Sequence, residues 1–329
     1  MITLPSLARV SRALISAFAI VAAASPAAAQ DAYPSKPVRI VVPFAAGGPA
    51  DVYARILALR LQETMGQPFV VDDRPGAGSI IGTDAVAKSA PDGYTLLLMS
   101  NAHTVNESLI ANKPFQLMRD FVPIAPINSS DLVLVARSGL PVSTLQELIA
   151  AAKAKPGAMT YASSGPGTPY HMAGELFKAM AGVSILHIPY KGSSGARTDV
   201  LGDQVDMMFD AVTTMTEHVR QGKVKALGTT GKTRSEVMPE VPTIAEAGVP
   251  GYAAPTWSGV IAPAGVPRPI IEKLNAAINT AIQSPTFRER FAAIGDEPAG
   301  GTPEEFAELI RADSAKWGEV VRRSGARLD

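Results

Sequence analysis

The sequence predicts an α/β fold in two domains. Two stretches with the same layout, 38–51 and 159–172, each place a short strand before a glycine turn and a helix. Strands that alternate with helices in this way are typical of parallel sheets. About 300 residues remain once a leader is removed, a length that usually divides into two domains.

The first stretch reads VRIVVPFAAGGPAD and predicts a helix start above the end of a buried strand. Pro43 ends the strand. Gly47 and Gly48 allow a tight turn with unobstructed N–H groups, and Pro49 suits the first helical position. The helix is expected to pack inward through Val52, Ile56 and Leu59. Its outward N-terminus predicts an anion site, and the alternative is a helix start with nothing bound.

Residues 1–29 form a predicted secretory signal peptide. Arg9 and Arg12 precede an apolar run at 13–24, and an A-x-A site indicates cleavage after Ala29. The run is too short to span a bilayer. The chain has no cysteine, which excludes a thiol-anchored lipoprotein and a disulfide scaffold. We therefore expect an exported protein of a bacterial periplasm.

The charge balance argues against polyanionic partners. The 30 basic residues equal the 30 acidic ones, and losing two arginines with the leader leaves a formal charge of −2. So small a net charge gives no sign of the positively charged surface that binding to nucleic acid requires. We expect a monomer without a cofactor or a metal.

Two further strands are predicted in the first half, at 69–71 and 94–99. The first is followed by a glycine turn and a helix at 79–88, and the second by Ser100 and Asn101. Ligands of open α/β sheets bind beyond the carboxyl ends of the strands. We therefore expect one rim to gather Gly47, Gly48, Gly78, Ser100 and Asn101.

The second half begins its own pattern after a chain crossing near residue 130. Strand residues from 159 lead into Ser163, Gly165 and Gly167. Thr168 is the expected N-cap of the next helix, with Pro169 at its first position. The buried face of this helix is expected to carry Met172, Leu176 and Met180. The predicted lobes are 30–130 with 251–329, and 131–250.

Capping boxes predict two more helix starts. Thr144 with Glu147 begins one helix, and Thr302 with Glu305 begins the last. The last helix is expected to carry Phe306, Leu309 and Ile310 inward and to rejoin the first domain.

Several polar side chains have two interpretations each. Asp51 either caps its helix or contacts a ligand. Asp210 ends a strand and either binds a ligand amino group or locks a loop by accepting backbone N–H groups. Among four histidines, His103 and His171 follow strand ends closely enough to face a ligand. Lys191 either neutralises a second carboxylate or lies exposed on a turn.

The main alternative from another class is a secreted hydrolase. The closest segments to G-x-S-x-G, 162–165 and 192–195, each lack one glycine, and H-E-x-x-H does not occur. Neither nucleotide-loop pattern, G-x-x-x-x-G-K-[ST] or G-x-G-x-x-G, occurs either. The sequence therefore favours a binding protein over an enzyme.

Taken together, these segments resemble the extracytoplasmic solute receptors of tripartite tricarboxylate transporters, the Bordetella uptake gene family. The resemblance covers nearly all of the mature chain and rests on YPSKPVRIVVPFAAGGPAD, VVDDRPGAGSIIGTDAVAKSAPDGYTLL, MTYASSGPGTPYHMAGELFKAMAG, IPYKGSSGARTDVLGDQVDMMFD and VIAPAGVPRPIIEKLN. It implies a type II periplasmic binding fold, with two α/β lobes joined by two crossings. A small carboxylated solute would bind between the lobes and pass to membrane permease subunits. The solute could be a di- or tricarboxylate, an amino acid or an aromatic acid. A receptor for another transporter or for a sensor kinase is the alternative.

The resemblance also implies that two loops hold the solute carboxylate, partly through ordered water. In this sequence they comprise Phe44, Ala46, Gly47 and Gly48, and Ser163, Gly165, Gly167 and Thr168. The chain departs from the family pattern at Asp73, where an asparagine is expected. That departure puts a direct ligand role for the turn after the second strand in question.

Overall fold

The computed structural model describes residues 33–44, 46–190, 192–294 and 296–324. The predicted signal peptide and Lys191 lie outside the described residues. The chain divides into two units, Met1–Ser35 and Lys36–Asp329. The helices and strands described below all belong to the second unit.

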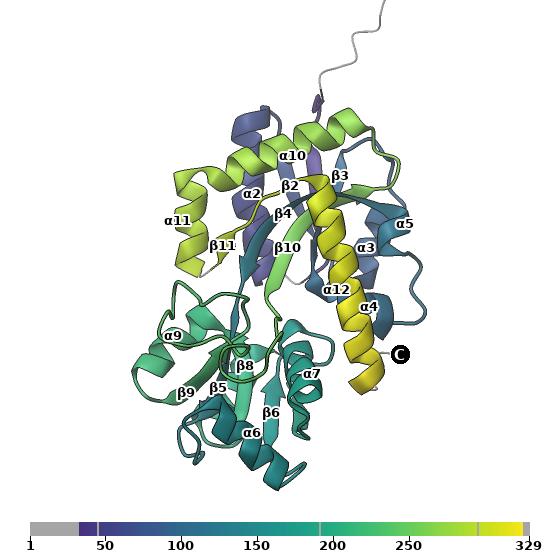
Figure 1. Ribbon diagram of the computed structural model, residues 1–329. Coiled ribbons are helices and arrows are strands. Elements are labelled where there is room, and N and C mark those ends of the chain that lie inside the picture. The colour runs from purple at the N-terminus through teal and green to yellow at the C-terminus, as the bar shows by residue number, and fades with distance from the viewer. Residues whose placement is uncertain (1–32, 45, 191, 295, 325–329) are drawn as a thin grey trace, which may run out of the picture. The chain divides into compact units, whose positions relative to one another are not determined.

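The first sheet has six strands in the order β11-β4-β10-β3-β1-β2 (Figure 1). They are β1 (Val38–Val42), β2 (Phe69–Asp73), β3 (Thr95–Ser100), β4 (Phe121–Ser130), β10 (Thr256–Pro263) and β11 (Glu297–Pro298). Strand β1 pairs in parallel with both β2 and β3. The three strands predicted in the first half therefore end at one edge, as expected. Strand β10 lies antiparallel between β3 and β4.

The second sheet has five strands in the order β7-β6-β8-β5-β9. They are β5 (Leu132–Arg137), β6 (Thr160–Ser163), β7 (Leu186–Pro189), β8 (Met207–Ala211) and β9 (Val224–Thr229). Strand β6 is parallel to β7 and β8, whereas β5 is antiparallel to β8 and β9. The chain enters this sheet through Asp131 alone and leaves it between β9 and β10. The fold thus has two α/β lobes, and their residue limits stay a prediction.

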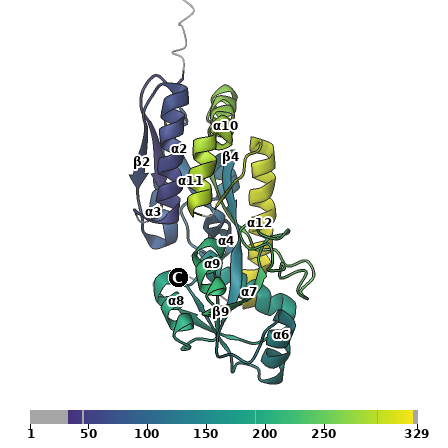
Figure 2. The same cartoon turned by 90° about the vertical axis from the view of Figure 1, so that its left-hand side faces the viewer.

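Helices cover both sheets (Figures 1 and 2). They are α2 (Pro49–Met65), η1 (Ala77–Ser79), α3 (Ile80–Ala87), α4 (Asn101–Leu109), α5 (Leu117–Asp120), α6 (Leu145–Ala154), α7 (Pro169–Ala181), α8 (Ser193–Leu201), α9 (Val212–Arg220), α10 (Arg268–Gln283), α11 (Pro285–Ile294) and α12 (Pro303–Ser324). Both predicted capping boxes are confirmed: the N–H groups of Glu147 and Glu305 donate to the hydroxyls of Thr144 and Thr302. Within the described residues, none of these helices combines the length and the apolar character that crossing a membrane requires.

Three side chains predicted to face inward are exposed instead. Leu59, Met180 and Leu309 keep 43%, 39% and 37% of their surface accessible. On α2 the inward stripe runs through Leu57 and Leu61, which are fully buried. Leu59 is two positions from each and so faces away from the sheet. A sequence with several apolar residues per turn does not show which ones form the stripe.

Helix α12 rejoins the first lobe, as expected, and it also contacts the second lobe. Phe306 and Ile310 belong to a buried cluster of the first sheet. Further along the helix, Trp317 and Val320 belong to the cluster that holds Phe177 of α7. Figure 1 shows α12 running alongside α4 toward α7, and α12 is in contact with both helices. Besides the two chain crossings, the C-terminal helix therefore joins the lobes by packing against both.

Candidate functional site

The first glycine loop follows β1 and opens α2. Phe44 is partly buried, whereas Ala46 and Gly47 are exposed. Gly47 has φ +76°, a left-handed conformation, and Gly48 is the extended N-cap with φ −79° and ψ 171°. The Gly47 N–H donates to Asp51 Oδ2 over 2.7 Å. Asp51 is 4% exposed, so it stabilises the loop from within.

The second glycine loop, Ser163 to Thr168, follows β6 and opens α7. Gly167 has φ +74°, and its N–H donates to Nδ1 of His171 over 3.0 Å. Thr168 is the N-cap, as predicted, and its hydroxyl accepts the His171 N–H. The Gly165 N–H donates to Oγ of the fully buried Ser163 over 3.1 Å.

The two loops are copies of one local structure. In each, a left-handed glycine precedes the N-cap and a proline takes the first helical position. In each, the third helical residue accepts the glycine N–H through its side chain, a carboxylate at Asp51 and an imidazole at His171. The predicted repeat is thus confirmed. The expectation of an unobstructed N–H group is wrong for Gly47, whose N–H already has an acceptor, and the N–H of Gly167 has one as well.

The end of β3 lies beside the first loop. Ser100 is the N-cap of α4, and its N–H donates to Nδ1 of His103 over 3.2 Å. The His103 ring meets the Phe44 ring edge-on at a centroid distance of 5.8 Å. Burial lowers the pKa of His103 to about 4, so the ring is neutral near pH 7. Asn101 begins α4, and its buried Oδ1 has no hydrogen-bond partner among the described residues. Helix α4, which was not predicted from the sequence, therefore anchors this part of the rim.

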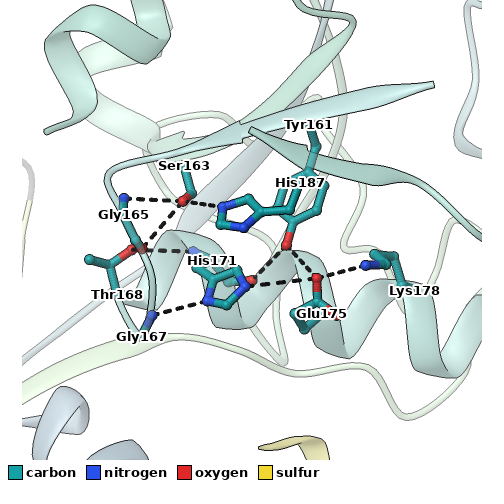
Figure 3. A network of polar contacts seen from close by, with 9 residues as sticks. All are labelled: Tyr161, Ser163, Gly165, Gly167, Thr168, His171, Glu175, Lys178 and His187. Carbon is teal, nitrogen blue, oxygen red and sulfur yellow. Dashed lines mark hydrogen bonds and ion pairs between the residues drawn. The ribbon is translucent and has the colours of Figure 1, made fainter. Parts of the chain in front are cut away.

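A buried polar network lies behind the second loop (Figure 3). Ser163 Oγ lies 2.7 Å from Nε2 of His187, whose ring stacks on that of His171 at 4.1 Å. The other face of His187 stacks on Tyr161 at 4.8 Å. The Tyr161 hydroxyl donates to Oε1 of Glu175 over 2.6 Å. His187 follows Ser163 by 24 residues, and no spacing in the sequence signals that they meet.

Asp210 is held by its own lobe. It is 1% exposed; its Oδ2 accepts from Arg197 Nε over 2.8 Å, and its Oδ1 accepts the Ala211 N–H over 2.9 Å. Of its two interpretations, the observed bonds are those that lock a loop. Burial raises its pKa, opposed by Arg197. Arg197, which lies on α8, was not predicted from the sequence, and a solute contact at Asp210 stays a prediction.

Asp296 of the first lobe gathers two polar side chains and acts on the pKa of a residue in α7. Tyr53 on α2 and Asn128 on β4 both hydrogen-bond to Asp296. Burial raises the pKa of Tyr170, and the charges of Asp210 and Asp296 raise it further. The charge of a carboxylate from each lobe thus raises the pKa of Tyr170. This group was not predicted, because its members lie far apart in the chain.

The paired Ser163 and His187 do not form a usable nucleophile, despite their short contact. Ser163 has no exposed surface, and its oxygen already accepts the Gly165 N–H. A nucleophile has to reach the substrate. In the part of the chain that the structure describes, no three His, Cys, Asp or Glu side chains are grouped to hold a metal ion.

Comparison with known proteins identifies the family. Residues 53–326 match the model of the tripartite tricarboxylate transporter family receptor. The chain belongs to this receptor family. BugT of Bordetella pertussis is 42% identical over 318 residues, which cover 96% of this chain and 98% of BugT.

Solved receptors share the fold. A protein of R. palustris solved with adipate is 34% identical with a TM-score of 0.77, covering 90% of this chain and all of that one. MatC from Rhodopseudomonas palustris, solved with bound malate, is 31% identical with a TM-score of 0.73, covering 88% of this chain and all of MatC. The predicted family and the two-lobed periplasmic binding fold are therefore confirmed. Receptors of this family are periplasmic solute-binding proteins.

Proposed function

We propose that this protein captures a small carboxylate-bearing solute between its lobes and delivers it to the permease of a tripartite tricarboxylate transporter. The observation that carries the proposal is the pair of matched loops, one in each lobe. Each stands at the carboxyl end of a parallel strand and opens a helix. Adipate and malate in the solved relatives are carboxylates, which supports the same class here.

The donors for the carboxylate are the first-turn N–H groups of α2 and α7. Helix N-termini favour anions by about 0.3 to 1 kcal/mol when exposed and more when partly buried. Gly47 and Gly167 shape the loops, since their N–H groups bind side chains of the protein itself. The predicted contacts at Phe44, Gly48 and Thr168 remain part of the proposal. So do the other predicted contacts on the two rims: Ala46, Ser100, Asn101, Ser163, Gly165, His171 and Asp210.

Binding without turnover follows from the same geometry. The relatives are solute-binding proteins, and the serine of the serine–histidine pair described above is buried. Export by cleavage after Ala29 and the tripartite permease as partner are part of the proposal. The other candidate partners, another transporter or a sensor kinase, have no observation in their favour.

Thermal-shift measurements on residues 30–329 test this function. The panel consists of mono-, di- and tricarboxylates with the matching neutral amides as controls. A carboxylate at 100 times its Kd adds about 2.7 kcal/mol of stability, whereas its amide should add nothing. Mass analysis after incubation should return the acid unchanged. Stabilisation by amides and carboxylates alike, or appearance of a product, would contradict the proposal.

A further inference from the structure

Both glycine N–H groups of the second loop depend on an imidazole nitrogen. The Gly167 N–H donates directly to Nδ1 of His171. The Gly165 N–H donates to Ser163 Oγ, which lies 2.7 Å from Nε2 of His187. The Ser163 hydroxyl proton has two acceptors within reach, Nε2 of His187 at 2.7 Å and Gly165 O at 3.3 Å, and Nε2 is the nearer of the two. The loop is thus tied to two histidines, one directly and one through a serine (Figure 3).

The bond from Gly167 requires the His171 ring to be neutral, and a bond from the Ser163 hydroxyl to Nε2 requires the same of His187. A nitrogen that accepts a hydrogen bond carries no proton, so neutral His171 is protonated at Nε2, and His187 is protonated at Nδ1 when its Nε2 accepts the Ser163 proton. A proton on Nδ1 of His171 would oppose the Gly167 N–H, and a proton on Nε2 of His187 would turn the Ser163 hydroxyl proton toward Gly165 O. The rings are stacked 4.1 Å apart at an interplanar angle of 17°, so charging both would also place two cations face to face.

Among the groups around the stacked rings, Glu175 favours a charged histidine, but burial outweighs it. The titratable and charged side chains that face them are Tyr161 on β6, Glu175 and Lys178 on α7, and Tyr252 beyond Tyr161. Glu175 Oε1 lies 3.8 Å from Nε2 of His171, but it also accepts from Tyr161 and lies 2.7 Å from Lys178 Nζ. Burial lowers the pKa of both histidines, that of His187 to about 4.

We propose that His171 and His187 are positioning residues that hold the second glycine loop in the shape that binds the solute carboxylate. The inference rests on the proposed function, because it concerns the same loop. The first loop performs the equivalent task with the carboxylate of Asp51. The second loop is instead held by groups that gain a positive charge in acid, so solute affinity should fall as the pH drops from about 6.5 toward 4.

Two substitutions separate the two connections. His171→Leu removes the acceptor of the Gly167 N–H, and His187→Phe keeps the stacked ring but removes the acceptor for Ser163. In ¹⁵N-glycine-labelled protein, His171→Leu should accelerate amide exchange mainly at Gly167, and His187→Phe mainly at Gly165. Equal acceleration at both glycines in both variants would indicate general loosening and would overturn the proposal, as would no acceleration at either.

Binding is measured by calorimetry with malate and adipate at pH 7.5 and 5.0, with circular dichroism to verify folding. Against whichever acid binds, His171→Leu should be about tenfold weaker at pH 7.5. His171→Asn offers a neutral oxygen at the helix position that Asp51 occupies in the first loop. It should bind within about threefold of wild type and lose less affinity at pH 5.0. Wild-type affinity for His171→Leu would overturn the inference. If wild type binds neither acid, the proposed function fails for these solutes, and glycine exchange decides the role of the histidines separately.

Discussion

Adjacent glycines of the first loop should respond in opposite ways to the same substitution. Gly47 has φ +76°, and a Cβ added there would meet no atom within 4 Å. The cost of Gly47→Ala is therefore conformational and amounts to about 1 to 2 kcal/mol, the penalty of a left-handed L-residue. Gly48 has φ −79° and ψ 171°, which alanine adopts freely. Gly48→Ala should stabilise by about 0.4 to 1 kcal/mol by restricting the unfolded chain.

Urea unfolding followed by circular dichroism measures the difference, which should be roughly 1.5 to 3 kcal/mol between two neighbouring positions. Gly167→Ala provides the matched comparison in the second lobe, because its φ of +74° predicts the same cost as Gly47→Ala. Equal effects at Gly47 and Gly48 would refute the assignment of strain to the first glycine alone. A Gly48→Ala protein that is stable but binds poorly would instead place its new methyl group in the path of the carboxylate.

Three further outcomes are expected. Asp313→Ala should lower the free energy of unfolding in urea by about 3 to 5 kcal/mol, because donors on α4, β10 and α12 share this one buried acceptor. A decrease of less than about 1 kcal/mol would contradict this. His103 has its pKa lowered to about 4, so its neutral form contributes stability above pH 6.5 that is lost as the pH falls to 4. In His103→Gln the free energy of unfolding should therefore fall by roughly 3 kcal/mol less than in wild type between pH 6.5 and pH 4. An unchanged dependence of stability on pH would contradict this. A bound carboxylate should lower the radius of gyration in small-angle scattering. Acrylamide quenching of the buried Trp257 and Trp317 should stay low both with and without the solute. Stronger quenching in the solute-free protein would argue for a different motion.

Helix starts could be predicted because their signals lie within a few residues of each other. Pro49 and the pair Thr168 and Pro169 are found where the sequence places them. The loop repeat was visible for the same reason. Its closing bond was missed, although the signal exists: Asp51 and His171 each follow a left-handed glycine by four residues. The sequence thus predicted which residues stand at the start of each helix, but it did not predict which groups their side chains bind.

Contacts between distant segments could not be predicted from local patterns. His187 meets Ser163 across neighbouring strands, and Arg197 meets Asp210 between a helix and a strand. Each pair depends on the order of the strands in the second sheet, and no single segment of the sequence determines that order. The exposed Leu59 is the converse case: local periodicity was present, but it allowed more than one inward face. The candidate site was therefore predicted through its loops, whereas the groups that support those loops required the structure.

The contacts between the lobes differ in chemistry from one side to the other, which favours one direction of opening. On one side, Val105 of α4 and Trp317 of α12 share a buried apolar cluster with Phe177 of the second lobe. Separating that cluster would expose apolar surface at about 25 cal/mol per Å². On the other side the charge of Asp296 acts on Tyr170, and such polar groups regain hydration when they part. The motion of lowest cost is therefore expected to pivot about α12 and to open the side where Tyr170 lies in the first turn of α7, which is the side of the second glycine loop.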